Sequence, residues 1–170
     1  MANNEWRTPP HFIESARKVM GSIDTDPASN DEAQKTVQAG VHYTEETDGL
    51  SQYWMNNVWL NPPYGRGLAE PFIATLVNQF EAGYTDQAIV LLNTVYTSNW
   101  WGNTGINQFY SALCLPKGRI AFINPETGKP EKGNDRDQII VYLGDNTTAF
   151  CEEFSKYGVC HLPYRPISFM

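Results

Sequence analysis

Hydrophobic residues recur along the chain with two periods, and these periods predict alternating helices and strands. Apolar positions near helical spacing predict helices over 11–20, 31–39, 68–80 and 147–157, with a helical or irregular stretch over 98–110. Short apolar runs bounded by polar or turn-forming residues predict strands over 22–26, 58–60, 88–92, 120–123 and 138–143. A polar segment containing Gly128, Pro130 and Gly133 predicts a loop over 124–137.

The order of these elements predicts the fold class. Helices alternate with the first strands, which is typical of an α/β protein whose mostly parallel sheet has helices on both faces. The last two predicted strands have no helix between them, and they indicate a terminal antiparallel hairpin. A length of 170 residues fits one domain, so we expect a single domain over 1–170 with no separate domain for recognising a target.

The composition is typical of a globular protein with a packed core, since 41% of the residues are hydrophobic and 18% are charged. No apolar run approaches the roughly 20 residues that cross a membrane, and the polar stretch Met1 to Arg7 has no signal-peptide core. The three cysteines are widely spaced and odd in number, which indicates neither a disulfide framework nor a zinc site. We therefore expect a protein of the reducing cytoplasm without a metal.

The charge distribution narrows the way in which the chain could meet nucleic acid. A formal net charge of −7 counts against a general nucleic-acid binder, which is usually basic. An enzyme that meets DNA through one local basic patch remains possible, and Lys129, Lys132 and Arg136 in the 124–137 loop are the candidates for it. Acidic residues are interspersed among them, so a solvated loop is the alternative interpretation.

One turn carries a specific chemical pattern. Asn61-Pro62-Pro63-Tyr64 directly follows the predicted strand 58–60, where open α/β sheets bind ligands. The Asn61 side-chain carbonyl can accept one N–H of an exocyclic amine, and the Pro62 backbone carbonyl can accept the other. Two fixed acceptors favour a tetrahedral nitrogen, and the prolines stiffen the turn before substrate arrives. Tyr64 offers a flat face for an extruded base. A proline-rich turn that merely ends a strand is the structural alternative.

Several short motifs occur in an order that resembles a known enzyme family. Asn61-Pro62-Pro63-Tyr64 resembles the Asn/Asp-Pro-Pro-Tyr motif of methyltransferases that act on adenine N6. Other matching segments are Trp6-Arg7-Thr8-Pro9-Pro10, Asp26-Pro27-Ala28-Ser29, Asp48-Gly49-Leu50 and Gly118-Arg119-Ile120-Ala121-Phe122. Over about residues 5–143, this order is similar to the phage-type DNA N6-adenine methyltransferases, the phage Dam family.

The resemblance implies a fold, a cofactor and a set of site residues. The fold would be a Rossmann-like class I methyltransferase, the methyl donor S-adenosylmethionine, and the partner DNA, in the host cytoplasm if a phage encodes the protein. The catalytic turn would hold a flipped adenine with Asn61, Pro62, Pro63 and Tyr64. The resemblance further implies cofactor contacts from Trp6, Thr8, Pro9, Asp26, Pro27, Ala28, Asp48, Leu50 and Asn61.

The cofactor loop departs from the family pattern. Asn30 and Asp31 stand where the usual glycines would follow Asp26-Pro27-Ala28, so a close backbone approach to the methionine end is not ensured by glycine. Asp26 is also open to two assignments. It can end the first strand beside the methionine end, or it can end the second strand and bind the ribose hydroxyls. We favour the first assignment because the Thr8-Pro9 segment lies just before it.

Two further functions remain open from the sequence. A protein glutamine amide is also a planar, weakly nucleophilic amine, and enzymes that methylate it carry a similar Asn-Pro-Pro-Tyr turn. A related fold that binds a nucleotide or a partner without turnover is the non-enzymatic alternative, supported by the missing cofactor glycines. Methyl transfer to adenine-containing DNA separates these possibilities from a DNA adenine methyltransferase.

Overall fold

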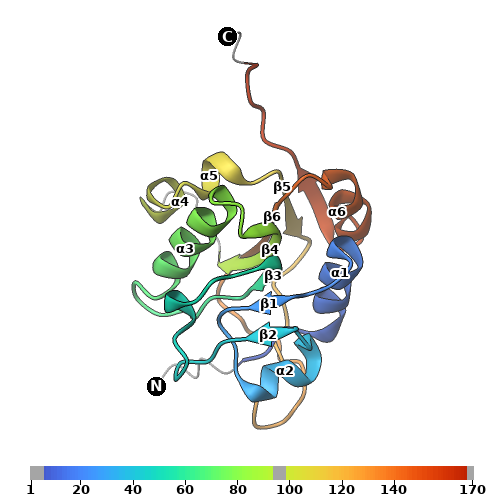
Figure 1. Ribbon diagram of the computed structural model, residues 1–170. Helices are drawn as coiled ribbons and strands as arrows, with labels where there is room; N and C mark the ends of the chain where they lie inside the picture. Colours follow the sequence, from blue (N-terminus) through green and yellow to red (C-terminus); the bar gives the residue numbers. More distant parts are fainter. Residues whose placement is uncertain (1–5, 94–98, 168–170) are drawn as a thin grey trace.

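The computed structural model describes residues 6–93 and 99–167, and in these ranges a central sheet lies between two layers of helices (Figure 1). The strands are β1 (Thr25–Asp26), β2 (Val41–His42), β3 (Asn56–Leu60), β4 (Thr85–Asn93), β5 (Ala112–Pro116), β6 (Gln138–Leu143) and β7 (Gly158–His161). The helices are α1 (Pro10–Met20), α2 (Asp31–Val37), α3 (Ala69–Glu81), α4 (Asn99–Asn103), α5 (Ile106–Phe109) and α6 (Thr147–Phe154), with a 3-10 helix η1 (Gly49–Ser51).

The strands form one sheet in the order β2-β1-β3-β4-β6-β5-β7. β2, β1, β3 and β4 pair in parallel, whereas β6 is antiparallel to both β4 and β5, and β7 is antiparallel to β5. The expected α/β architecture with a mostly parallel core and a Rossmann-like arrangement is therefore confirmed. No helix in the described ranges is long and apolar enough to cross a membrane.

The connections between the parallel strands reverse their direction at one point of the sheet. From β1 the chain moves outward to β2, then returns to the other side of β1 as β3 and continues to β4. The direction of winding thus reverses between β1 and β3, which pair at Thr25 and Val58. Ligands of open α/β sheets bind outside the carboxyl ends of the strands at such a switch point. Asp26 and Asn61 both lie at this edge.

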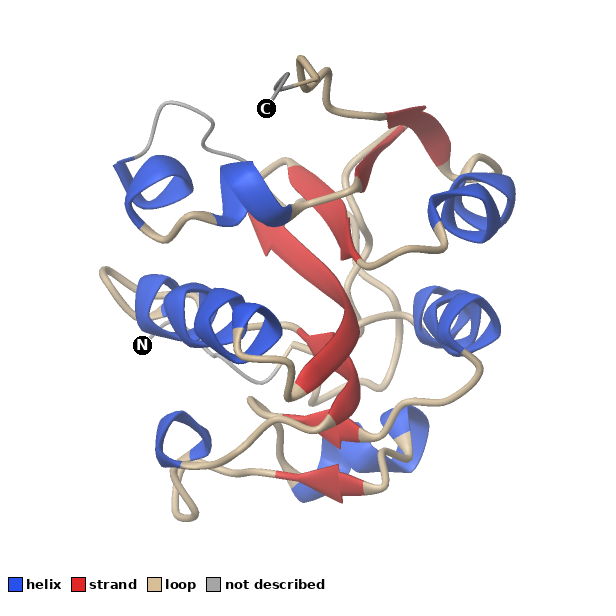
Figure 2. Cartoon of the chain, turned by 45° about the horizontal axis from the view of Figure 1, so that its top comes forward, coloured by secondary structure: helices blue, strands red, loops and turns tan. Residues whose placement is uncertain are grey.

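Helices lie on both sides of the sheet (Figure 2). The core therefore has two layers, because the side chains of successive strand residues point to opposite faces. Trp59, Ile89 and Leu91 pack in the cluster that includes α1 and α6. Val58 and Val90, from the same strands, pack with α3 and α5 on the opposite face. Burial on both faces explains why β4 and β6 appear in the sequence as continuous apolar runs.

The antiparallel half of the sheet differs from the prediction. The predicted strand 120–123 is wrong: Ile120 is buried, but only Ile123 of this segment makes backbone bridges, to Arg7 and Pro130. The strand in this region is β5, which pairs with both β6 and β7. The prediction also missed β7 and β2. Both are edge strands with partly exposed side chains, so their sequences lack a clear apolar period.

The helices are closer to prediction. α1, α2, α3 and α6 each overlap a predicted helix, and the stretch 98–110 divides into α4 and α5, apart from Ser98, which lies outside the described residues. α3 contains Pro71 at its third position, where a missing backbone N–H costs no helical hydrogen bond. Asn30 caps α2, since its side-chain oxygen accepts a hydrogen bond from the Ala33 backbone at 2.8 Å.

Candidate active site

The turn after β3 holds its asparagine by one end of the side-chain amide. Asn61 Nδ2 donates a hydrogen bond to Thr8 Oγ1 at 3.2 Å, and Thr8 is itself buried. Asn61 Oδ1 is buried and has no hydrogen-bond partner in the described part of the chain. Buried polar atoms are nearly always paired in native proteins, so an unpaired acceptor indicates a position for an external donor. The Thr8 contact fixes the direction of this acceptor.

Tyr64 ties the same turn to the neighbouring strand. Its hydroxyl donates a hydrogen bond to the backbone carbonyl of Leu91, one residue beyond Val90, which pairs with Leu60 at the end of β3. The phenol thus continues the contact between the two strands past the last paired residues. Burial raises the pKa of Tyr64, and a backbone hydrogen bond from Asn93 opposes this only in part. The hydroxyl therefore remains a neutral donor.

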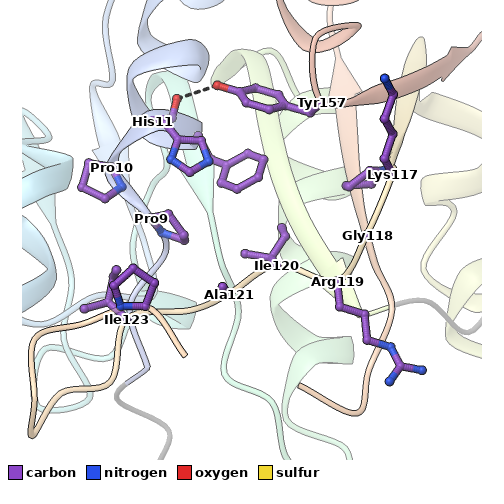
Figure 3. Close-up of a pocket in the computed structure, with 13 residues that line it drawn as sticks. Pro9, Pro10, His11, Lys117, Gly118, Arg119, Ile120, Ala121, Ile123 and Tyr157 are labelled. Atoms are coloured by element: carbon purple, nitrogen blue, oxygen red, sulfur yellow. Dashed lines mark hydrogen bonds between the residues drawn. The ribbon is translucent and has the colours of Figure 1, made fainter. Parts of the chain in front are cut away.

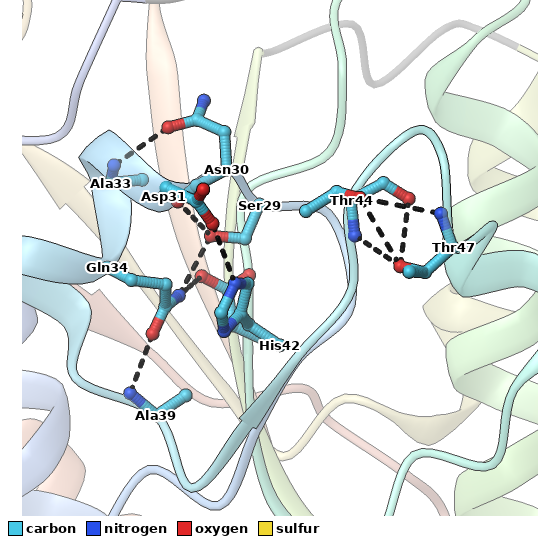
Figure 4. A network of polar contacts seen from close by, with 10 residues as sticks. Ser29, Asn30, Asp31, Ala33, Gln34, Ala39, His42, Thr44 and Thr47 are labelled. Atoms are coloured by element: carbon cyan, nitrogen blue, oxygen red, sulfur yellow. Dashed lines mark hydrogen bonds and ion pairs between the residues drawn. The ribbon is translucent and has the colours of Figure 1, made fainter.

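Asp26 is the last residue of β1, and only one of its two carboxylate oxygens has a hydrogen-bond partner in the described residues. Its Oδ2 accepts a hydrogen bond from Gln34 Nε2 at 2.8 Å, while Oδ1 is buried without a partner in the described residues. Burial raises the pKa of Asp26 to about 6, and the polar groups of Ser29, the Ala28 backbone and Gln34 oppose this rise only in part. Gln34 is held in turn by Ser29 and by the backbone of Ala39 (Figure 4). The open Oδ1 position is thus built into a fixed network.

Asp48, Gly49 and Leu50 lie directly against the loop that follows β1. A Cβ atom at Gly49 would stand 2.0 Å from the carbonyl oxygen of Pro27, so only glycine permits this approach. The buried Trp54 holds this segment in place, because its Nε1 donates a hydrogen bond to the Gly49 carbonyl oxygen at 2.8 Å. The side chains of Asp48 and Leu50, on either side of Gly49, are exposed to solvent. Two of the predicted cofactor segments are therefore side by side.

The segment before α1 pairs with the long polar loop. Arg7 and Ile123 exchange two backbone hydrogen bonds of 3.1 and 2.8 Å. The loop folds back on itself, because Asn124 N donates to the Lys129 carbonyl and Glu131 N donates to the Phe122 carbonyl. Residues 122–131 thus form a short hairpin, hereafter the 122–131 hairpin, whose base is attached to the segment that contacts Asn61 through Thr8.

The three basic candidates of the loop are exposed, but they are not equivalent. Arg136 lies 3.8 Å from Asp135, whereas Lys129 and Lys132 make no ion pair in the described residues. No hydrogen bond or ion pair joins any of the three to Asn61, Asp26 or the other candidate residues within the described ranges. Lys129 belongs to the 122–131 hairpin, and Lys132 and Arg136 follow on its return to β6.

A separate hollow lies beside the candidate residues. It has a volume of about 340 Å³ and is lined by the start of α1, residues 116–121 and Tyr157 (Figure 3). Tyr157 donates to the His11 carbonyl across it at 3.0 Å. Of the candidate site residues, only Pro9 reaches this hollow. Neither Asp26 nor any residue of the 61–64 turn lines this hollow.

Contacts join several of the predicted site residues. Thr8 contacts Asn61, Pro27 contacts Gly49, and β1 lies beside β3. Trp6, next to Arg7, is partly exposed, and Pro9 and Ala28 are adjacent in sequence to Thr8 and Pro27. Sequence reasoning gave no role to Arg7, whose Nε is buried without a hydrogen-bond partner in the described residues. The sequence did contain one signal for Arg7, because this cation lies inside the segment that was expected to contact a cofactor with a carboxylate group.

Comparisons with known proteins agree with this arrangement. A family model described as DNA N-6-adenine-methyltransferase (Dam) matches residues 1–157. A DNA N-6-adenine-methyltransferase of Escherichia phage T1 is 29% identical over 153 residues, which cover 81% of this chain and 61% of the relative. Another, of Haemophilus phage HP1, is 26% identical over 140 residues, covering 80% of this chain and 76% of the relative. The chain thus spans less than two thirds of the length of the phage T1 protein.

Proposed function

Because the chain belongs to the DNA N-6-adenine-methyltransferase (Dam) family, we propose that it methylates the N6 amine of adenine in DNA with S-adenosylmethionine as the donor. The observation that carries the proposal is the unpaired Oδ1 of Asn61, held in place through Thr8 at the end of β3. An acceptor in this position suits an amine hydrogen, since it needs a donor and has none.

The chemistry assigns a task to each of the first two residues of the turn. Asn61 Oδ1 accepts one N6 hydrogen and the Pro62 backbone carbonyl accepts the other, so the nitrogen lone pair becomes available for the new bond. When bound, S-adenosylmethionine would supply an electrophilic methyl group on a sulfonium, with the S–CH3 bond broken and the thioether S-adenosylhomocysteine as the leaving group. The N6 proton is lost to water after methylation, so no side chain has to act as a base. Asn61 therefore acts by orientation and charge complementarity.

The cysteines support transfer without a covalent enzyme intermediate. Burial raises the pKa of Cys114 to about 12 and that of Cys160 to about 11, so neither provides a thiolate near neutral pH. Cys114 lies in the middle of β5 and Cys160 lies in β7. Both strands are at the end of the strand order away from β1 and β3, where the turn begins. A direct transfer to the amine is the mechanism that fits these surroundings.

The residues of the switch point fit the chemistry of the methyl donor. The buried Oδ1 of Asp26 offers an unpaired acceptor of the kind that an ammonium group requires. In this assignment Asp26, Pro27 and Ala28 hold the methionine end, with Trp6, Thr8 and Pro9 over it. Asp48 and Leu50, which are exposed beside Pro27, contact the adenine of the cofactor. The position of β1 beside β3 supports the first-strand assignment of Asp26.

We further propose that loops of this one domain contact the DNA. The 124–137 loop and the residues after Leu92 face the duplex, although residues 94–98 lie outside the described part. Replacing Lys129, Lys132 and Arg136 by Ala weakens binding for all sequences and lowers the salt dependence by about 0.9 per lost phosphate contact in a log–log plot. Lys35→Ala, in the last turn of α2, is the control. An unchanged affinity and salt dependence would move the DNA surface elsewhere.

Label transfer tests the function against its alternatives. The protein is incubated with radiolabelled S-adenosylmethionine and either duplex DNA or a protein with exposed glutamines. We expect label in the DNA and none in the protein acceptor. Label in the protein instead would favour glutamine amide methylation, and cofactor binding without transfer to either acceptor would favour a non-catalytic relative.

A further inference from the structure

Arg7 presents a buried hydrogen-bond donor that nothing in the described chain uses. Its side chain is only 20% exposed, and its Nη1 contacts Glu32 Oε1 at 3.1 Å. The Nε–H is buried without a partner. A guanidinium keeps its charge at every pH at which a protein is folded, so it cannot relieve its burial by losing a proton. An unpaired charged donor in such a place is costly unless a ligand completes it.

The Glu32 contact does not by itself explain the position of Arg7. The Glu32 side chain is 52% exposed and is shared with Lys35, whose Nζ lies 2.6 Å from Oε2. Exposed ion pairs of this kind stabilise a protein by about 0–1 kcal/mol. The two backbone hydrogen bonds with Ile123 nevertheless fix the Arg7 main chain firmly. The Glu32 contact uses Nη1 and leaves the buried Nε–H of Arg7 without a partner in the described residues.

A complementary group contacts the same helix, α2. Glu32 of α2 contacts Arg7, and Gln34 of the same helix contacts the carboxylate of Asp26. Asp26 also has one buried atom without a partner, the acceptor Oδ1, and no ion pair within the described residues joins it to Arg7. Of the other two buried unpaired side-chain atoms in these ranges, one is Asn61 Oδ1, and Asn107 in α5 lies outside this group.

An open cationic donor and an open anionic acceptor, both buried and both braced by α2, match a ligand that carries the two opposite charges. We infer that Arg7 binds the α-carboxylate at the methionine end of the cofactor through Nε, while Asp26 faces the α-ammonium group. The inference rests on the proposed function, which supplies the ligand, and it adds a residue to which the sequence motifs assign no role. Arg7 is a binding residue for the cofactor and takes no part in the chemical step.

Two ligands that differ in one group test the assignment. S-adenosylhomocysteine carries the α-carboxylate, and its decarboxylated analogue keeps the ammonium group but lacks the carboxylate. Calorimetry gives the affinity of the wild type for both. A charge-assisted hydrogen bond predicts that the wild type prefers S-adenosylhomocysteine by about 10- to 100-fold. Arg7→Met should bind the two compounds nearly equally, and Arg7→Lys should keep part of the preference because it keeps the charge.

Lys35→Met is the matched control, since Lys35 contacts the same Glu32 and its replacement leaves Arg7 in place. We expect it to keep the wild-type preference. If Arg7→Met retains the full preference, or weakens both ligands by the same factor, the assignment is wrong while the proposed methylation stands on its label-transfer test. If the wild type binds neither compound, the cofactor proposal fails and the assignment of Arg7 fails with it.

Discussion

Two buried carboxyl groups on the two halves of the sheet have opposite surroundings. Glu153 in α6, beside the antiparallel half, accepts hydrogen bonds from Ser15 at 2.8 Å, from Lys18 at 2.6 Å and from Lys156. The Lys156 and Lys18 ammonium groups lower the pKa of Glu153 to about 2. Asp26, at the end of β1 in the parallel half, has one hydrogen-bonded oxygen, one oxygen without a partner in the described residues, and a pKa raised to about 6 by burial.

The difference separates a carboxylate that holds the fold together from one that is prepared for a ligand. Glu153 joins α1 to α6, and both of its carboxylate oxygens accept hydrogen bonds from side chains of the protein. Asp26 and Asn61 are equally inaccessible to water at one atom each, yet the described chain leaves those atoms unpaired. Unpaired buried groups lower stability, so their occurrence at a ligand-binding edge indicates function. In the proposed function, the parallel half therefore carries the site and the antiparallel half supports it.

The largest effect is expected at the unpaired acceptor itself. Asn61→Ala should reduce methyl transfer by roughly 10²- to 10³-fold, the range found when one preorganised hydrogen-bonding group is removed from an active site. Cofactor affinity should stay close to wild type. Asn61→Asp should keep more activity, since an acceptor oxygen remains and the Thr8 hydroxyl can donate to the second carboxylate oxygen. Single-turnover kinetics measure both variants, and wild-type rates from Asn61→Ala would remove the turn from the mechanism.

The next effect concerns the close contact between two predicted cofactor segments. Gly49→Ala should lower the free energy of unfolding by about 2–4 kcal/mol, because its Cβ would stand 2.0 Å from the Pro27 carbonyl oxygen. Cofactor affinity should fall as well. Gly102→Ala is the control, since nothing lies within 4 Å of a Cβ there. Urea unfolding of both variants measures the effect, and equal stabilities would show that the two segments can separate at little cost.

A smaller effect should distinguish the two carboxyl groups by pH. Asp26 has a folded pKa near 6 and an ordinary value of 3.8, so the folded state binds its proton more tightly and stability falls as pH rises through this interval. Glu153 has a folded pKa near 2 and an ordinary value of 4.5, so its stabilisation is present above that value and is lost as pH falls toward 2.

The matching variants are Asp26→Asn and Glu153→Gln, followed by urea unfolding from pH 3 to pH 8. Near pH 7, Asp26→Asn should leave stability unchanged or raised, whereas Glu153→Gln should lower it and remove part of the acid dependence. Effects of the same sign near pH 7 would contradict the distinction between a ligand-binding and a structural carboxylate.

The smallest effect is expected from the Tyr64 hydroxyl. Tyr64→Phe removes the hydrogen bond to the Leu91 carbonyl and should cost about 1 kcal/mol of stability, with a modest loss of turnover because the flat ring remains. Tyr64→Ala should reduce turnover more strongly. Tyr53→Phe, on a ring that is 63% exposed, is the control. A Tyr64→Phe variant as impaired as Tyr64→Ala would mean that the hydroxyl, and not the ring, matters for turnover.

The parallel half of the fold could be predicted because its signals are local. Strands buried on both faces give continuous apolar runs, and β4 and the end of β3 showed them clearly. The polar turn directly after β3 then followed from chain order alone. The antiparallel half was predicted less well, since the pairing of β5 with β6 and β7 depends on partners distant in sequence. Residues 120–123 have strand-like composition, but only Ile123 forms backbone bridges, and these join it to Arg7 and Pro130.

The site shows the same limit. The motif order indicated Asp26, Asp48 and Asn61, but it could not indicate that Oδ1 of Asp26 and Oδ1 of Asn61 lack partners. Nor could it indicate that Gly49 must be a glycine to approach Pro27, because that constraint arises only when η1 packs against the loop after β1. The sequence could not indicate Arg7 for the same reason, because the lack of a partner for its Nε–H in the described residues depends on the folded surroundings.

The most direct test of the central claim is the identity of the methylated base. Duplex DNA is labelled with the wild type and radiolabelled S-adenosylmethionine and then digested to nucleosides for chromatography. We predict that the label elutes with N6-methyl-2′-deoxyadenosine and that Asn61→Ala produces little of it in the same time. Label in a methylated cytosine, or equal amounts of labelled adenine nucleoside from both proteins, would contradict the account.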